Sequence, residues 1–157
     1  TLPSTTNGAI SVGYYNQNNN SVVSESGNGY TRNGSIKPDI VAGGSNALVT
    51  TPGGTTSVMT GSSVAGAVVA GCCALILQWA VSDGNYPDIY ASQIKTYIIS
   101  GAKTRPGDIY PNRQWGYGMF DLQRIFDWIQ QTYTPRINDD FEEYRVKNLF
   151  IRKPKDL

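Results

Sequence analysis

The sequence predicts an α/β protein with buried strands that are followed by helices. Two short apolar segments, Ala9–Tyr15 and Asp39–Ala42, are bounded by polar residues or glycines and are typical of interior strands. Three segments with the composition or spacing of helices follow, at 63–80, 90–102 and 121–131. Strands and helices in this order favour a layered α/β fold around one core.

The sequence supports the expected strands of the first half to different degrees. Ala9–Tyr15 runs into the polar stretch Asn16–Asn20, which predicts a buried strand that ends in a turn. Ser21–Ser26 is a second strand candidate, closed by the glycine-rich segment 27–35. The segment 46–61 fits either a loop or short strands, and its pattern leaves both open.

The helices have clearer limits. Alanine and leucine favour a helix over 63–80, and the segment 82–88, with Asp83, Gly84 and Pro87, ends it. The second and third helices carry apolar residues at helical spacing, which are Ile94, Tyr97, Ile98, Leu122, Ile125, Phe126 and Ile129. Each of these two helices is therefore expected to pack one face on the core.

Composition narrows the function classes. The 157 residues suggest one domain, and a net charge of +1 without a long basic patch argues against nucleic-acid binding. The chain has no histidine, so it lacks the commonest general base and metal ligand. No carboxylate cluster has calcium-loop spacing, so we expect no metal and no cofactor. The adjacent Cys72 and Cys73 are predicted to be buried small apolar residues without a disulfide.

The segment Val64–Val81 allows three interpretations. Only Gln78 is clearly polar among these 18 residues, so a membrane span, a core helix and a catalytic serine at a buried helix all fit. No positive charge lies close to its ends, and five alanines and two glycines dilute its hydrophobicity. These features favour a core helix over membrane insertion.

Ser62 and Ser63 stand where this helix is expected to begin. A helix N-terminus offers unpaired N–H groups that stabilise an oxyanion, and Gly61 leaves room for a substrate backbone. A serine in this place is equally suited to capping the helix. These residues alone do not decide between a nucleophile and an N-cap.

The order of residues in 61–71, G-S-S-V-A-G-A-V-V-A-G, resembles the nucleophile segment G-T-S-x-A-x-P-x-V-A-G of the subtilisin-like serine proteases, the subtilases. In this register Gly61 is the glycine and Ser63 the nucleophile. Ser62 replaces the threonine and Ala67 replaces the proline of the pattern. Neither departure removes a group that the chemistry needs.

Other segments resemble the same family in the same order. They are I-K-P-D-I-V-A-G-G at 36–44, A-I-S-V-G-Y-Y-N at 9–16, S-G-N-G at 26–29 and W-G-Y-G-M-F-D-L at 115–122. The opening T-L-P-S is similar to a wall of the specificity pocket, which implies a cis Leu2–Pro3 bond. Several of these segments are similar in sequence to the bacterial spore-germination branch of the subtilases.

The resemblance implies the C-terminal half of a three-layer fold, with a mostly parallel sheet and a central buried nucleophile helix. Residues 1–131 would form this half-domain, and 132–157 an extension packed on the core. The Asp, His and oxyanion Asn of the family would then lie in an N-terminal half, because this chain begins at Thr1 after that region.

The implied function is a serine endopeptidase that acts through an acyl-enzyme on Ser63, with its backbone N–H as an oxyanion donor. The implied substrate contacts are Thr1, Ser4, Thr60, Gly61 and Ser62. The chain alone would be inactive. The alternatives are a pseudoprotease that serves as a binding or regulatory module, and a self-standing interaction protein.

The expected partners are a protein or peptide substrate and a cover for the apolar helix. That cover would be the N-terminal half of the same protease or a second copy of this chain. A bacterial protein that is extracellular or spore-associated is expected from the family, and this chain shows no signal peptide.

Overall fold

The computed structural model describes residues 4–132 of the chain. Its elements, in chain order, are β1 (Val12–Asn16), β2 (Ser21–Val22), β3 (Ile40–Gly43), β4 (Ala47–Thr51), β5 (Thr55–Met59), α1 (Ser62–Leu77), a π-helical turn (Gln78–Ser82), α2 (Ala91–Ser100) and α3 (Leu122–Thr132). The predicted α/β class is therefore confirmed. The predictions for Thr1, for the Leu2–Pro3 bond and for the tail beyond Thr132 fall outside the described residues.

The main sheet has three strands in the order β2-β1-β3. β1 and β3 are parallel, in a register that runs from Val12↔Ile40 to Tyr15↔Gly43. β2 is antiparallel to β1 and pairs only with its last two residues, Tyr15 and Asn16. Within the described residues, the edge of Val12–Tyr14 that faces away from β3 therefore has no strand beside it.

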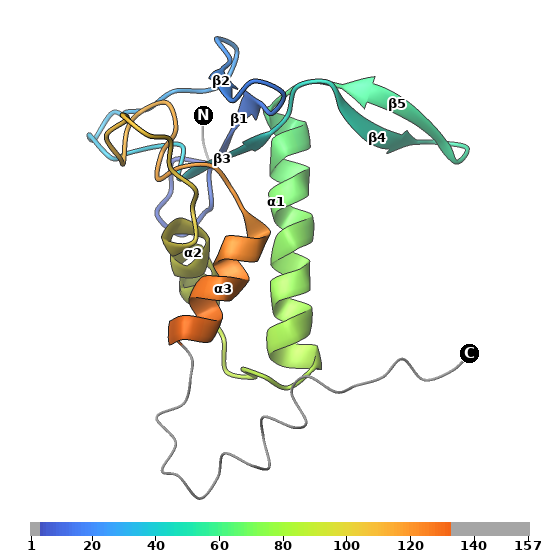
Figure 1. Cartoon of the computed structure of the whole chain (residues 1–157), viewed down its shortest axis with the longest axis vertical. Helices are drawn as coiled ribbons and strands as arrows, with labels where there is room; N and C mark the ends of the chain where they lie inside the picture. The colour runs from blue at the N-terminus through green and yellow to red at the C-terminus, as the bar shows by residue number, and fades with distance from the viewer. Residues whose placement is uncertain (1–3, 133–157) are drawn as a thin grey trace, which may run out of the picture.

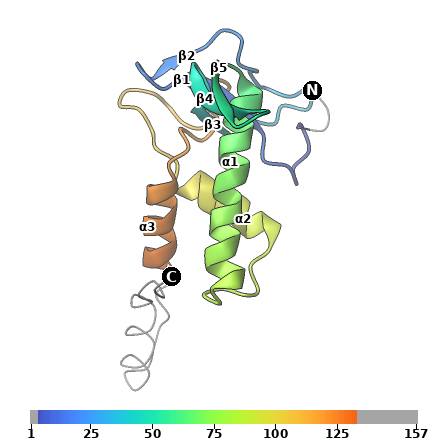
Figure 2. The same cartoon turned by 90° about the vertical axis from the view of Figure 1, so that its right-hand side faces the viewer.

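The two faces of β3 are covered differently. Ile40 and Ala42 are buried in the main core, which they share with residues of all three helices. Val41 points to the opposite face and packs there with Trp115 and Met119. Figures 1 and 2 show the helices on one side of the sheet. The opposite face of β3 is covered by the loop before α3, which carries Trp115 and Met119.

Helices α2 and α3 pack as their sequence periodicity predicts. Ile94, Tyr97 and Ile98 of α2 are buried, as are Ile125 and Ile129 of α3. Leu122 and Phe126 lie partly buried against the same core. Both helices begin with side-chain caps, in which the Tyr90 N–H donates to Gln93 Oε1 (3.1 Å) and the Arg124 N–H donates to Asp121 Oδ1 (3.2 Å).

Strands β4 and β5 form a hairpin in the segment whose pattern left loop and strand open. Their register runs from Ala47↔Met59 to Thr51↔Thr55, and the turn uses Gly53 and Gly54 at φ angles of 86° and 75°. The hairpin extends away from the rest of the fold (Figure 1). The second strand candidate, Ser21–Ser26, is shorter than expected, because only Ser21 and Val22 pair with β1.

Helix α1 is buried on one side only within the described residues. Ala65, Val69 and Ile76 are buried, whereas Val68 and Leu75 are 46% and 50% exposed. The helical stretch Ser62–Ser82 is long and apolar enough to cross a membrane, a property that the core helix of a soluble protein shares. Cys72 and Cys73 are half-buried rather than buried, because they adjoin the open side of α1. The expectation of full burial was wrong for this part of the fold.

Candidate active site

Ser62 and Ser63 are the first two residues of α1, and both are exposed. Gly61 occupies the N-cap position with φ 150° and ψ 165°, a conformation that favours glycine. No side chain caps the helix. The N-cap interpretation of the serines is therefore wrong, since both lie inside the first turn and leave the cap to a glycine.

The start of α1 presents unpaired N–H groups. The Val64 and Ala65 N–H groups both donate to the Gly61 carbonyl oxygen, at 3.2 and 3.3 Å. The preceding N–H groups of Ser62 and Ser63 have no acceptor among the described residues. Orphan donors at a helix N-terminus favour a negatively charged oxygen, so the Ser63 hydroxyl lies beside a group that could stabilise an oxyanion.

The entry into α1 lies close to the sheet. The Gly61 N–H donates to the Gly44 carbonyl oxygen at 2.8 Å, and the Gly44 N–H donates to Tyr15 O at 3.2 Å. A Cβ atom on Gly44 would stand 2.8 Å from both Gly61 O and Tyr14 Cβ. Gly44 is therefore required here, because any side chain would push the start of α1 away from β1.

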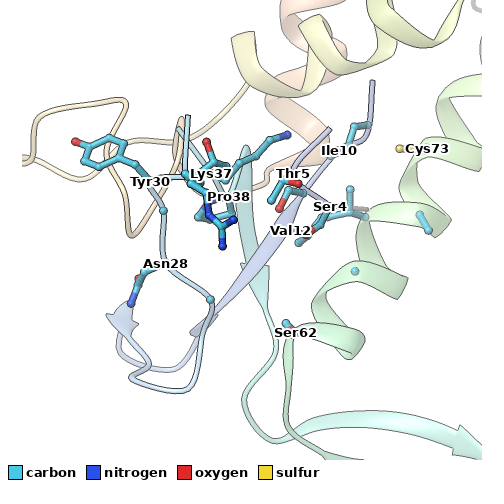
Figure 3. A pocket seen from close by; sticks show the side chains of 18 residues that line it. Ser4, Thr5, Ile10, Val12, Asn28, Tyr30, Lys37, Pro38, Ser62 and Cys73 are labelled. Atoms are coloured by element: carbon cyan, nitrogen blue, oxygen red, sulfur yellow. The ribbon is translucent and has the colours of Figure 1, made fainter. Parts of the chain in front are cut away.

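A hollow of about 890 Å³ lies between α1 and the loop around Gly29 (Figure 3). Ser62 and Cys73 line it from α1, and Asn28 and Tyr30 line it from the loop on the other side, where the Tyr30 ring points away from α1. Its full lining is Ser4, Thr5, Ile10, Ser11, Val12, Gly27, Asn28, Gly29, Tyr30, Thr31, Arg32, Lys37, Pro38, Ser62, Gly66, Val69, Ala70 and Cys73. The hollow thus begins next to the serine pair and runs along the segment Ile10–Val12 that leads into β1.

Three charged side chains hold the segment that leads from the hollow into β1. Asp39 Oδ2 lies 2.7 Å from Lys37 Nζ, and Asp39 Oδ1 lies 2.9 Å from Lys95 Nζ. The same carboxylate accepts the Ser11 N–H at 2.7 Å. The two ammonium groups also donate to main-chain carbonyl oxygens of Thr6, Asn7 and Ala9 at 3.0–3.3 Å. The wall near Ser4 and Thr5 is therefore fastened both to the residues just before β3 and to α2.

The two cysteines are poor candidates for a nucleophile. Burial raises the pKa of the Cys72 thiol above its usual range. Burial also raises the pKa of Cys73, and the neighbouring Cys72 adds to this effect. Because the thiolate is the reactive form, both thiols are held in the less reactive state at neutral pH. Ser63, which is exposed in the first turn of α1, thus remains the candidate for a nucleophile.

The structure brings together part of the predicted set of site residues. Ser4 and Ser62 line the same hollow, while Ser63 lies on the exposed turn beside it. Thr60 and Gly61 lead into that turn, and Thr1 lies outside the described residues. Sequence reasoning missed Asn28, Tyr30, Thr31 and Arg32, although the glycine-rich segment 27–35 was a signal for an exposed loop.

The described residues contain no cluster of side chains suited to binding a metal ion. No group of three or more His, Cys, Asp or Glu side chains could hold an ion there. With no histidine in the sequence, Ser63 has no imidazole partner from this chain.

The chain belongs to the Subtilase family, whose profile matches residues 1–118. It is similar to the CspB protease of Clostridium perfringens, with 41% identity and a TM-score of 0.77 over 82% of this chain and 28% of CspB. It also shares its fold with the prenylagaramide maturation protease PagA (24% identity, TM-score 0.66, 80% of this chain and 44% of PagA). A mutant protease domain of PatA is similar too, with 22% identity and a TM-score of 0.65 over 83% of this chain and 43% of that domain.

The comparison with curated proteins found no match. The chain spans less than half the length of each of these solved proteases. The family and its protease relatives support a serine protease. The fold is therefore a fragment of the subtilisin-like fold, which agrees with the open edge of β1 and the open side of α1.

Proposed function

We propose that the full-length protein is a serine endopeptidase in which Ser63 is the nucleophile. The observation that carries this proposal is the position of Ser63 in the first turn of α1, exposed and beside unpaired N–H groups. Membership of the Subtilase family supports the same role, because Ser63 stands at the serine of the family's nucleophile pattern.

The chemistry requires a base that this chain does not supply. A histidine from the rest of the protein, oriented by an aspartate, would take the proton of the Ser63 hydroxyl as Oγ attacks the peptide carbonyl carbon. The Ser63 N–H and an asparagine side chain would then share the negative charge on the carbonyl oxygen. Collapse of this intermediate expels the amine, which takes the proton from histidine, and water hydrolyses the acyl-enzyme. The chain alone is expected to be inactive.

The substrate would be a protein or peptide segment that passes over the start of α1. Gly61 has no side chain, so a backbone could approach the turn closely. Ser62 and Ser4 line the adjacent hollow and would face the substrate. Thr1 is proposed as a further substrate contact next to Ser4, and this proposal is based on the family resemblance alone.

The missing part of the protease would cover what this chain leaves open. The edge of Val12–Tyr14 could accept another strand, and the exposed apolar side of α1 needs a covering layer. An N-terminal half of the same protein would supply both, and a second copy of this chain is the other candidate cover. Either cover would place α1 in a protein interior rather than in a membrane.

Active-site labelling of the full-length protein with a fluorophosphonate, followed by peptide mapping, tests the nucleophile. We expect phosphonylation at Ser63, its loss in Ser63→Ala and its retention in Ser62→Ala, because the latter keeps the attacking hydroxyl. Label on another serine would reject Ser63 as the nucleophile.

A folded full-length protein without any label would instead favour the alternative, a pseudoprotease that serves as a binding or regulatory module. The departures at Ser62 and Ala67 from the family pattern are compatible with that outcome. The sequence of the remainder adds a second check, since an active enzyme needs both the aspartate and the histidine there.

A further inference from the structure

Thr60 is the residue between the β4–β5 hairpin and the N-cap of α1, and its hydroxyl is engaged within the fold. The Asn46 N–H donates to Thr60 Oγ1 at 2.8 Å. At the open end of the hairpin the last pair is Ala47↔Met59, and Asn46 and Thr60 are the next residues beyond it on the two strands. A side-chain oxygen therefore continues the hairpin by one more cross-strand hydrogen bond.

The strip opposite Thr60, residues 44–46, is fixed to the sheet. The Gly44 N–H donates to Tyr15 O at 3.2 Å, and the Ser45 N–H donates to Gln17 Oε1 at 3.1 Å. The Gln17 amide in turn donates to the Ser45 carbonyl oxygen. Gly44 and Ser45 are buried, so this strip is a firm support on the end of β1.

Two hydrogen bonds join the entry of α1 to that support. They are Asn46 N–H to Thr60 Oγ1 and Gly61 N–H to Gly44 O, both 2.8 Å long. The hairpin itself projects away from the fold (Figure 1), and residues 52–60 are all exposed, so packing does little to hold this segment. No side chain caps α1 either. Removing one of the two bonds should therefore loosen the start of the helix.

We propose that Thr60 is a positioning residue for Ser63, which rests on the proposed nucleophilic role of that serine. The Thr60 hydroxyl fixes the backbone three residues before Ser63. It thereby sets where the Ser63 Oγ and N–H stand relative to the sheet. This role differs from the substrate contact that the family resemblance implies, because the hydroxyl is already bonded to Asn46.

The test uses the full-length protein and three variants. Thr60→Val keeps the shape of the side chain and removes the hydroxyl, while Thr60→Ser keeps the hydroxyl. Thr56→Val is the matched control, because Thr56 is an exposed threonine of β5 that pairs with Thr50 and has no hydroxyl hydrogen bond in the described part. The readouts are the second-order rate of fluorophosphonate labelling and the amide hydrogen exchange of residues 61–65, in which the hydrogen-bonded N–H groups of Gly61, Val64 and Ala65 carry the signal.

We expect Thr60→Val to slow labelling about three- to tenfold, the usual effect of one neutral hydrogen bond. Exchange at 61–65 should become faster, with little change in the rest of the protein. Thr60→Ser and Thr56→Val should both stay within about twofold of the wild type. Recovery in Thr60→Ser separates the hydroxyl from a general effect of substitution.

Unchanged exchange at 61–65 in Thr60→Val would overturn the proposal, and so would faster exchange with an unchanged labelling rate. Equal losses in Thr60→Val and Thr56→Val would also overturn it, because they would show only that the hairpin is sensitive. A wild-type protein that takes no label would refute the nucleophilic role of Ser63. The exchange comparison would still show whether Thr60 holds the start of α1.

Discussion

Replacing Asp39 by asparagine should cost this fold much stability although it hardly changes the shape of the side chain. Its carboxylate is bonded to two ammonium groups and to the Ser11 N–H, and its side chain is only 6% exposed. Lys37, the nearer cation, is 9% exposed. Asp39→Asn keeps the volume but removes the negative charge, which leaves a buried cation without its counter-ion.

The expected magnitude follows from that burial. Removing one partner of a buried ion pair costs about 3–5 kcal/mol, mostly because the remaining charge stays desolvated and unpaired. Lys95→Met should cost less, about 1–2 kcal/mol, since Lys95 is 19% exposed and Asp39 keeps its bond to Lys37. The exposed Lys103 is the control, and Lys103→Met should change the free energy of unfolding by less than about 0.5 kcal/mol.

Urea unfolding of the full-length protein, followed by tryptophan fluorescence, measures the order of the three variants. Trp115 and Trp79 lie in the two core clusters and report on this part of the fold. We expect the midpoint to fall most for Asp39→Asn, less for Lys95→Met and hardly at all for Lys103→Met. If Asp39→Asn were as stable as Lys103→Met, the view of this cluster as a buried support for the segment 6–11 would be wrong.

Three further results are expected. Gly101→Ala should destabilise the protein by about 1–3 kcal/mol in thermal unfolding, because its Cβ would stand 2.6 Å from Ile125 Cα, whereas the exposed Ser100→Ala should not. The rate of Cys73 alkylation, measured by mass spectrometry, should be low at pH 7 and should still increase above pH 9, because burial raises the pKa of this thiol. A rate at pH 7 like that of a free thiol would contradict this. Leu75→Glu should destabilise the full-length protein, because the missing part of the protease would cover Leu75 on α1. Ile109→Glu is the control, since Ile109 is a loop residue that is 86% exposed, and it should not change stability. Equal stability of both variants would mean that nothing covers α1.

Much of the fold could be predicted from local patterns. Helical spacing placed Ile94, Ile98 and Ile125 on buried faces, because one face of a helix against a core produces that spacing whatever lies beyond it. The order of residues in 61–71, together with further segments in the family's order, was enough to suggest the family, since a nucleophile at a helix start needs small residues around it. The role of Ser63 itself stays a prediction until it is labelled.

The chain's own sequence thus determined the α/β class, the helix faces, the family and a candidate nucleophile, all of which depend on residues close together in the chain. Only the tertiary structure decided that Gly61 rather than a serine caps α1, that Lys95 shares Asp39 with Lys37, and that the Thr60 hydroxyl belongs to Asn46. The contacts of Lys95 with Asp39 and of Asn46 with Thr60 join segments that lie apart in the sequence. Their partners are set by how the sheet, the hairpin and α2 meet, which no local pattern of residues encodes.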